Sequence, residues 1–394
     1  MTLSIKLPNT SGQVEAYTLR GTTPVKPAAG VKFNRIAYSA AHVVADPLAA
    51  IDPWLQCAVD WDETIAYRQR LWSLGLGVAE AMDTAQRGMG LDWPTSLELI
   101  RRSLDAAKDV PGALVASGCG TDHLVLENVK TVDEVIKGYE EQMAAIEKLG
   151  GKLIVMASRA LARVAKSPAD YERVYDRILS QAKQPVVLHW LGDMFDPALK
   201  GYWGNNDPDK AMDTALAVIA AHPDKVDGIK ISLLDKDKEI AMRRRLPAGV
   251  RMYTGDDFNY AELIAGDGVG SEVTHGQSDA LLGIFDAIAP AASAALGELA
   301  QGNVAKFHEI LGPTVPLSRH IFAAPTRFYK TGVVFMAWLN GHQKHFTMVG
   351  GQQSTRSLPH FAELFRLADA ANLLEQPDLA VRRMNTLAAL HGVE

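Results

Sequence analysis

The chain has 394 residues, of which 47% are hydrophobic and 22% charged, a balance that is typical of a folded protein and excludes a disordered or fibrous one. Its formal net charge of −6 argues against nucleic acid as a partner. The two cysteines, Cys57 and Cys119, are too few for a disulfide framework. The sequence shows neither a leader pattern nor an apolar run of about 18 residues, so we expect a cytoplasmic protein without membrane contact.

The first 32 residues are expected to form an extension ahead of the main fold, with a β-hairpin made by SIKLP and VEAYTLRG. From residue 33 on, short apolar segments alternate with helical patterns, which is typical of βα units around a parallel sheet. We therefore predict an α/β fold, a (β/α)₈ TIM barrel, over residues 33–277. The expected strands are Ile36–Ala41, Gly77–Met82, Gly112–Ser117, Lys152–Ala157, Pro185–Trp190, Val226–Ile231, Val250–Thr254 and Gly268–Ser271.

Signals for helix starts support this alternation. Thr95 with Glu98 and Thr131 with Glu134 fit capping boxes. Ser167 precedes a proline, which is typical of a helix N-cap and first turn.

Residues 278–394 are expected to form a helical region that packs on the barrel, because no low-complexity linker separates the two. Its basic runs RFYK, at 327–330, and HQKH, at 342–345, are interpreted as solvated faces without chemistry. The expected helices are Leu281–Ala289, Ala291–Leu299, Val304–Leu311, Gly332–Leu339 and Pro359–Ala370.

Active sites of TIM barrels form at the carboxyl ends of the strands, and Lys230 lies near such an end in VDGIKIS. Strand alternation sends Ile229 and Ile231 toward the helices and Lys230 into the lumen. An ammonium group there is costly unless it is paired or its pKa is lowered, and a neutral amine is a nucleophile for carbonyls. The structural alternatives are a buried ion pair with Asp83 or Asp256, or a lysine whose amine reaches out of the strand end into solvent.

VDGIKIS resembles the Schiff-base strand of the dihydrodipicolinate synthase and N-acetylneuraminate lyase superfamily. Five further segments match motifs of that superfamily in order and place, so the chain looks like a distant, enlarged member of the class I aldolase type over about residues 35–374. These segments are MDTAQ (82–86), ASGCGTD (116–122), PVVLHW (185–190), TGDD (254–257) and AGDGVGS (265–271).

The resemblance implies a TIM barrel, an imine between Lys230 and a substrate keto group, and a homo-oligomer. It also implies that Thr84 and the loop around Gly118 and Gly120 hold a carboxylate beside the carbonyl, although both glycines also fit an ordinary turn. Cys119 is interpreted as a small buried residue. The expected substrate-binding residues are Asp83, Thr84, Gly118, Cys119, Gly120, Thr121, Arg159 and Asp256.

One departure from the superfamily concerns proton transfer. The usual tyrosine pair after the fourth strand is replaced by Ser158 and Arg159. Arg159 stays protonated, so it is no base, but it suits an anionic or polyhydroxy substrate. His189 is the first candidate for moving protons and Asp122 the second, with a structural core histidine as the alternative for His189.

Two other functions stay open. Asp83, His123 and His189 also suit a divalent metal, which would make the protein a metal-dependent sugar isomerase or hydro-lyase. The missing tyrosines also fit a catalytically inactive barrel that binds sugars.

The loop after the fifth strand is long and rich in aromatic residues, and long ordered loops are often functional. Its Tyr202, Trp203 and Asn205 are expected either to close over a ligand or to pack as a surface flap.

The favoured hypothesis is a Schiff-base lyase, an aldolase or dehydratase, acting on a small 2-keto acid or keto-sugar derivative from carbohydrate catabolism. No cofactor is expected beyond the covalent imine on Lys230, and a metal only under the alternative.

Overall fold

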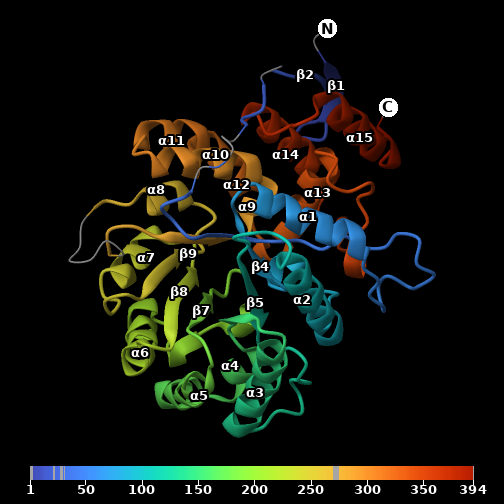
Figure 1. Ribbon diagram of the computed structural model, residues 1–394. Helices are drawn as coiled ribbons and strands as arrows, with labels where there is room; N and C mark the ends of the chain where they lie inside the picture. Colours follow the sequence, from blue (N-terminus) through green and yellow to red (C-terminus); the bar gives the residue numbers. More distant parts are fainter. Residues whose placement is uncertain (1–2, 21–22, 27–29, 31, 269–274, 394) are drawn as a thin grey trace.

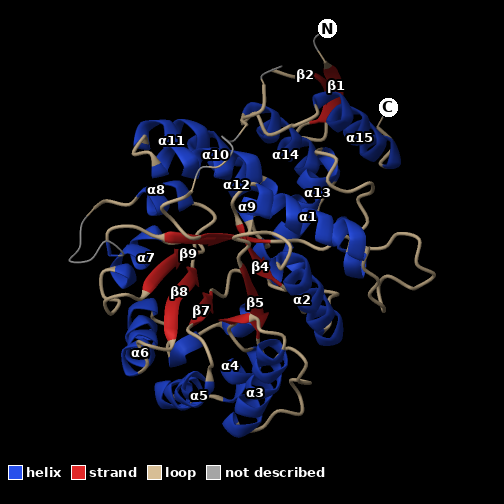
Figure 2. Cartoon of the chain, in the orientation of Figure 1, coloured by secondary structure: helices blue, strands red, loops and turns tan. Residues whose placement is uncertain are grey.

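The computed structural model describes residues 3–20, 23–26, 30, 32–268 and 275–393. Within them, eight parallel strands close into a barrel in chain order, with the last strand beside the first (Figure 2). The strands are β3 (Ala37–Ala40), β4 (Gly77–Glu80), β5 (Val115–Cys119), β6 (Lys152–Val155), β7 (Val186–Leu191), β8 (Val226–Ser232), β9 (Arg251–Thr254) and β10 (Asp279–Leu282). The predicted (β/α)₈ barrel is confirmed.

The eighth strand was predicted at the wrong place. Of the expected segment Gly268–Ser271, only Gly268 is among the described residues, and it is not in a strand. The barrel is closed instead by β10, which pairs with β3 and β9 and lies in the segment that was expected to be helical. An apolar run such as DALLGIFDAIA fits a buried strand and a buried helix equally well, so hydrophobicity alone did not separate β10 from the helix that follows it.

The barrel lumen is packed with side chains of the strands, among them Tyr38, Ala79, Ala116, Ile154, Val187, Tyr253 and Leu281. Gly228 of β8 faces this cluster, because a Cβ there would lie 2.7 Å from the ring of Tyr253. Alternation along β8 therefore directs Lys230 into the lumen, while Ile229 and Ile231 pack among residues of the surrounding helices. This orientation is the predicted one.

Helices cover the outside of the barrel (Figure 1). They are α1 (Trp61–Ser73), α2 (Trp93–Ala107), α3 (Val132–Lys148), α4 (Arg159–Val164), α5 (Pro168–Gln181), α6 (Pro208–Ala221), α7 (Lys236–Arg243) and α8 (Tyr260–Ala265). The capping box of Thr131 and Glu134 is confirmed at the start of α3. The box expected at Thr95 is wrong, because Asp92 caps α2 by accepting a hydrogen bond from the backbone N–H of Thr95 at 2.9 Å.

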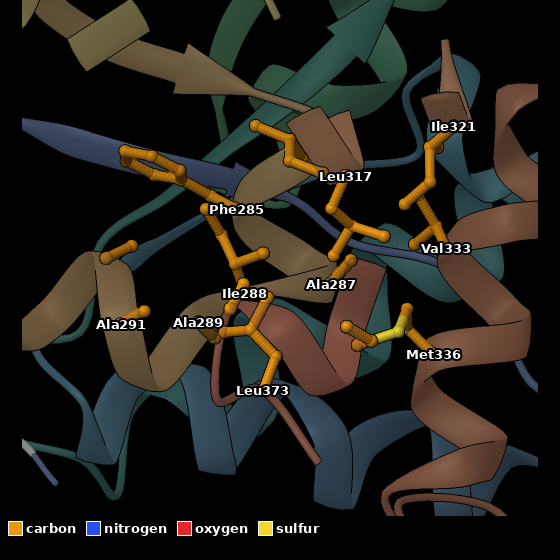
Figure 3. Packing of buried hydrophobic residues seen from close by; sticks show 14 of the residues in the cluster. Phe285, Ala287, Ile288, Ala289, Ala291, Leu317, Ile321, Val333, Met336 and Leu373 are labelled. Atoms are coloured by element: carbon orange, nitrogen blue, oxygen red, sulfur yellow. The ribbon is translucent and has the colours of Figure 1, made fainter. Parts of the chain in front are cut away.

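A second group of helices packs on one side of the barrel. Figure 3 shows Val333 of α13 beside Ile321 of α12, with Ala287 of α9 in the same apolar core. This agrees with the helical region expected after the barrel. The helices are α9 (Ile284–Ala287), α10 (Ala289–Ala300), α11 (Val304–Leu311), α12 (Val315–Ile321), α13 (Tyr329–Leu339), α14 (Leu358–Ala370) and α15 (Pro377–Leu390).

The N-terminal hairpin is confirmed as the antiparallel pair β1 (Ser4–Pro8) and β2 (Val14–Thr18). It lies beside α14 and α15, near the C-terminus (Figure 1). The Tyr17 hydroxyl donates a hydrogen bond to Asp369 of α14 at 2.6 Å, and Leu7 is fully buried. Among the helices that the structure describes, none combines the length and apolar character needed to cross a bilayer.

Candidate active site

Lys230 lies on β8 beside His189 of β7 and is 7% exposed. Gly255 leaves room for the lysine stem, since a Cβ at that position would lie 2.7 Å from Lys230 Cε. Burial lowers the pKa of the Lys230 amine, and the carboxylates of Asp257 and Asp83 oppose this shift. The amine is therefore partly prepared for the neutral, nucleophilic form.

Asp257, just after β9, is the buried carboxyl with the strongest influence on Lys230. Its Oδ1 accepts a hydrogen bond from the backbone N–H of Ile284 at 3.0 Å. Burial raises the pKa of this carboxyl to about 7, although the positive charge of Lys230 lowers it. The lysine and carboxyl pKa values are thus moved toward each other, which favours the neutral form of the amine.

Asp256 was predicted as a site residue from the sequence, and Asp257 was not. The side chain of Asp256 accepts hydrogen bonds from the backbone and the side-chain nitrogen of Asn259, at 3.0 and 2.8 Å. Asp256 therefore holds the turn after β9, while the charge of its neighbour Asp257 acts on the lysine. Both residues follow the strand end directly, where strand alternation no longer sets the side-chain direction.

His189 is buried next to Lys230, and its Nε2 lies 3.4 Å from the Ser232 hydroxyl. Burial lowers the pKa of the imidazole well below its usual value, and the charge of Lys230 adds to this effect. The ring is therefore neutral at neutral pH.

Two residues of the RFYK run reach the carboxyl end of the second barrel strand, so the interpretation of this run as a solvated face was wrong. Lys330 is 1% exposed and forms an ion pair with Asp83 at 3.0 Å. The Tyr329 hydroxyl lies 2.7 Å from Thr84 Oγ1. Burial raises the pKa of the Tyr329 phenol well above its usual value, and Asp83 adds to the shift, so the phenol keeps its proton.

A signal for this burial was present in the sequence. The residues that follow the run, TGVVFMAWL, are apolar on every face of the helix they form. Such a helix is buried all round, so the residues of its first turn enter the protein with it.

The glycine-rich segment expected to bind a carboxylate is partly strand. β5 extends through Cys119, so Gly118 and Cys119 belong to the barrel wall. A Cβ at Gly118 would lie 2.7 Å from the sulfur of Met156, so this glycine serves close packing. Burial raises the pKa of Cys119 to about 12, which keeps it a thiol.

The loop after β5 uses most of its polar groups within the protein. The backbone N–H of Gly120 donates to Gln142 at 2.7 Å, and the Thr121 and Ser158 hydroxyls lie 2.6 Å apart. The Thr121 hydroxyl keeps hydrogen-bonding capacity that is open to a ligand.

Asp122 is held by Arg87, whose Nε and Nη2 donate to its two oxygens at 3.0 and 2.7 Å. Burial raises the pKa of Asp122, but the charge and hydrogen bonds of Arg87 outweigh burial, so the net shift is downward. The sequence analysis missed Arg87. Asp122 is therefore better suited to a fixed charge than to proton transfer.

The residues of the proposed metal alternative do not come together. Asp83 pairs with Lys330, His123 Nδ1 lies 2.8 Å from Gln142, and His189 faces Ser232. Among the described residues, no three histidine, cysteine, aspartate or glutamate side chains are grouped as a metal ion would require.

A cavity of about 90 Å³ adjoins the lumen at the carboxyl ends of β4 to β7. His189 and Asp83 line this cavity. His189 is the strand neighbour of Lys230, and the charge of Asp83 acts on the lysine amine. Arg159 also lines it, with its Nε donating to Asp196. The complete lining is Met82, Asp83, Arg87, Gly88, Gly120, Thr121, Asp122, Leu124, Leu126, Met156, Ala157, Arg159, His189, Leu191, Asp196 and Leu199.

The aromatic residues after β7 do not close over this cavity. Tyr202 and Trp203 are buried, and their rings pack on Tyr171 and Tyr175 of α5. The Tyr202 hydroxyl accepts a hydrogen bond from the backbone N–H of Ser158 at 3.1 Å. These two aromatic residues pack on each other and on α5 inside the protein, rather than over a ligand.

Solved structures share this fold. Dihydrodipicolinate synthase from Aquifex aeolicus has a TM-score of 0.64 at 12% identity, covering 87% of this chain and 99% of that one. YagE, an E. coli K12 prophage protein of the dihydrodipicolinic acid synthase family, has a TM-score of 0.64 at 15% identity, with coverage of 86% and 99%. The synthase from Thermotoga maritima has a TM-score of 0.61 at 16% identity, also covering 86% and 99%. The expected resemblance is thereby confirmed in the fold.

No curated protein matches the sequence. One family model does match it, over residues 5–393, which is nearly the whole chain. The chain belongs to that family, described as "Protein of unknown function (DUF993)".

Proposed function

We propose that this protein is a Schiff-base-forming lyase, an aldolase or dehydratase acting on a 2-keto acid or keto-sugar derivative. The observation that carries the proposal is the buried Lys230 amine, which has a lowered pKa and lies beside His189 at the carboxyl end of the barrel. The charge of a buried carboxyl with a raised pKa, Asp257, acts on this amine. Buried groups with pKa values shifted toward neutrality are what proton transfer and amine nucleophilicity need.

In the first step, the neutral Lys230 amine attacks the keto carbon and forms a C–N bond. Asp257 takes the proton that the ammonium form of Lys230 must lose and returns it to the carbinolamine hydroxyl, which leaves as water. The amine and the keto compound thus give an imine and one water, with no oxidant or metal required.

In the second step, the protonated imine acts as the electron sink for cleavage of a carbon–carbon or carbon–oxygen bond. The neutral ring of His189 accepts the proton released from the substrate, since it lies beside Lys230. The Thr84 and Tyr329 hydroxyls lie 2.7 Å apart, and with the phenol as donor between them the threonine hydroxyl would be free to donate to the substrate carboxylate.

The shared fold supports the choice of reaction class. The structure of YagE is described as a complex with pyruvate, which is a 2-keto acid. Barrels of this architecture carry their chemistry at the carboxyl ends of the strands, where Lys230, Asp257 and His189 lie in this chain.

Reductive trapping tests the proposal. The protein is incubated with pyruvate and cyanoborohydride, and the adduct is sought by intact mass and peptide mapping. We expect one reduced adduct on Lys230. Lys230→Met should abolish it, while Lys225→Met, a change just before the same strand, should leave it unchanged. If pyruvate and a panel of longer 2-keto acids give no adduct, or if the adduct persists in Lys230→Met, the proposal is wrong.

A further inference from the structure

The cavity beside Lys230 is lined by polar groups that already have partners. Asp83 pairs with Lys330, Asp122 with Arg87, and the Thr121 hydroxyl bonds Ser158. Each carboxylate here is neutralised by a buried or half-buried cation. A ligand with several hydroxyl groups would therefore find few open hydrogen-bond partners, and each unpaired hydroxyl would lower its affinity.

The rest of the cavity wall is apolar. Thioether and aliphatic side chains face it from the ends of several strands and from the loops that follow them. They are Met82, Leu124, Leu126, Met156, Leu191 and Leu199. Such a wall favours a hydrocarbon segment over a polyol, because apolar groups gain free energy by leaving water.

Arg159 is the exception among the charged groups. Its Nε donates to Asp196, but its two terminal nitrogens have no hydrogen-bond partner among the described residues. The side chain is 39% exposed, which places it at the cavity rim. Gly88 lies against it, since a Cβ there would be 3.1 Å from Nη1. The free edge of the guanidinium group therefore offers two donors in the geometry that a carboxylate accepts.

We propose that the substrate of this site is a keto acid with a hydrocarbon arm that ends in a second anionic group. The keto carbon lies at Lys230, the arm lies along the methionine and leucine wall, and the terminal carboxylate binds the free edge of Arg159. For the reactive end of the substrate, this inference rests on the proposed imine chemistry. For the distal end, it rests on the cavity alone.

Reductive trapping with matched keto acids tests whether the site binds a hydrocarbon arm with a terminal carboxylate. The dicarboxylates 2-oxoglutarate, 2-oxoadipate and 2-oxopimelate are compared with 2-oxohexanoate, which lacks the second carboxylate, and with 2-keto-3-deoxygluconate, which carries hydroxyl groups. We expect the best dicarboxylate to half-saturate trapping at a concentration about 10-fold or more below that of either comparison compound, as one charge-assisted hydrogen-bond pair provides.

Variants locate the effect. Arg159→Gln should remove the advantage of the dicarboxylate over 2-oxohexanoate, whereas the surface change Arg173→Gln should leave both that advantage and pyruvate trapping unchanged. Met156→Gln should bring the half-saturating concentrations of 2-oxoadipate and the polyol closer together, because it adds a hydrogen-bonding group to the cavity wall. Equal trapping of the polyol and the dicarboxylate, or an equal effect of Arg159→Gln on every compound, would overturn the inference.

Calorimetric binding of adipate separates this inference from the proposed function, because adipate has no keto group. We expect it to bind the wild-type protein and to lose affinity in Arg159→Gln even if no imine forms on Lys230. If pyruvate forms an adduct on Lys230 while adipate binds both proteins equally or neither, the proposed binding of the hydrocarbon arm is wrong. The imine chemistry then stands.

Discussion

At the scale of single residues, the proposed chemistry depends on two opposed effects on Lys230 and Asp257. Burial disfavours both charged forms, whereas the attraction between the two charges favours them. When such effects nearly balance, the state with a proton on nitrogen and the state with it on oxygen have similar free energies. The pair then supplies a neutral amine without a large cost at neutral pH.

This balance gives the imine-forming step a predictable pH dependence. Below about pH 7, Asp257 is protonated and Lys230 is still an ammonium. The carboxyl then cannot take up the lysine proton, so the trapping rate should fall as the pH falls. In Asp257→Asn, the lysine loses its main counter-charge and its pKa drops further, so the acid limb should move to lower pH. The maximal rate should fall by about 10²-fold because the proton acceptor is gone. An acid limb at the same pH in both proteins would contradict this assignment.

His189 is predicted to act after the imine has formed. His189→Gln keeps a neutral polar side chain but removes the base, so pyruvate trapping on Lys230 should continue at nearly the wild-type rate. Exchange of the pyruvate methyl protons with deuterium, measured by NMR, should slow by about 10²-fold. Equal losses in trapping and exchange would instead assign His189 a structural role.

The sequence predicted Lys230 and His189 because both lie on strands, where alternation fixes the side-chain direction. It did not predict Asp257 over Asp256, because a turn and its hydrogen bonds decide which of the two faces the lumen. Arg87 was also missed, since its partner Asp122 follows a different strand. Residues in regular elements were thus accessible to pattern reasoning, and residues in loops were not.

At the scale of elements, α13 forms part of the site although it comes late in the chain. Its first turn brings Tyr329 to Thr84 and Lys330 to Asp83. The ion pair is nearly removed from solvent on the lysine side, where 2% of the side chain is exposed, and Asp83 is 23% exposed. Removing one partner of such a pair leaves the other charge without compensation.

Lys330→Met should therefore destabilise the fold by about 3 kcal/mol, measured by urea unfolding. Asp83→Asn in the same background should restore part of this loss, because the uncompensated carboxylate is then removed. A double-mutant cycle should give a coupling free energy of about 1 kcal/mol or more. Additive effects of the two changes would show that the pair contributes nothing to stability.

The start of α2 offers a second test at this scale. Asp92→Ala removes the N-cap hydrogen bond and should lower the free energy of unfolding by about 1 kcal/mol. Thr95→Ala lies inside the helix and should change it by less than about 0.5 kcal/mol. Had Thr95 been the cap, as its spacing to Glu98 suggested, the two results would be reversed.

At the scale of the whole molecule, the barrel and the helices after it share one apolar core. The same cluster contains Leu7 of the hairpin, Val78 and Leu282 of barrel strands, and Phe365 and Leu387 of the last two helices. The barrel was predictable because βα alternation repeats along the chain. The position of β10 was not, because the closing strand is defined by its pairing with β3, a contact far away in sequence.

Because the core is shared, a substitution that destabilises the terminal helices should also lower the free energy of unfolding of the barrel. Asp369 on α14 accepts hydrogen bonds from the Tyr17 hydroxyl and the Arg20 backbone, so Asp369→Ala should cost about 2 kcal/mol. In a Cys57→Ser background, the remaining thiol is Cys119, which is buried in β5. If unfolding is cooperative, the free energy of exposing Cys119 to a thiol reagent should fall by the same amount as the global free energy measured by circular dichroism. If Cys119 exposure is instead unchanged by Asp369→Ala, the terminal helices unfold apart from the barrel and the shared core does not couple them.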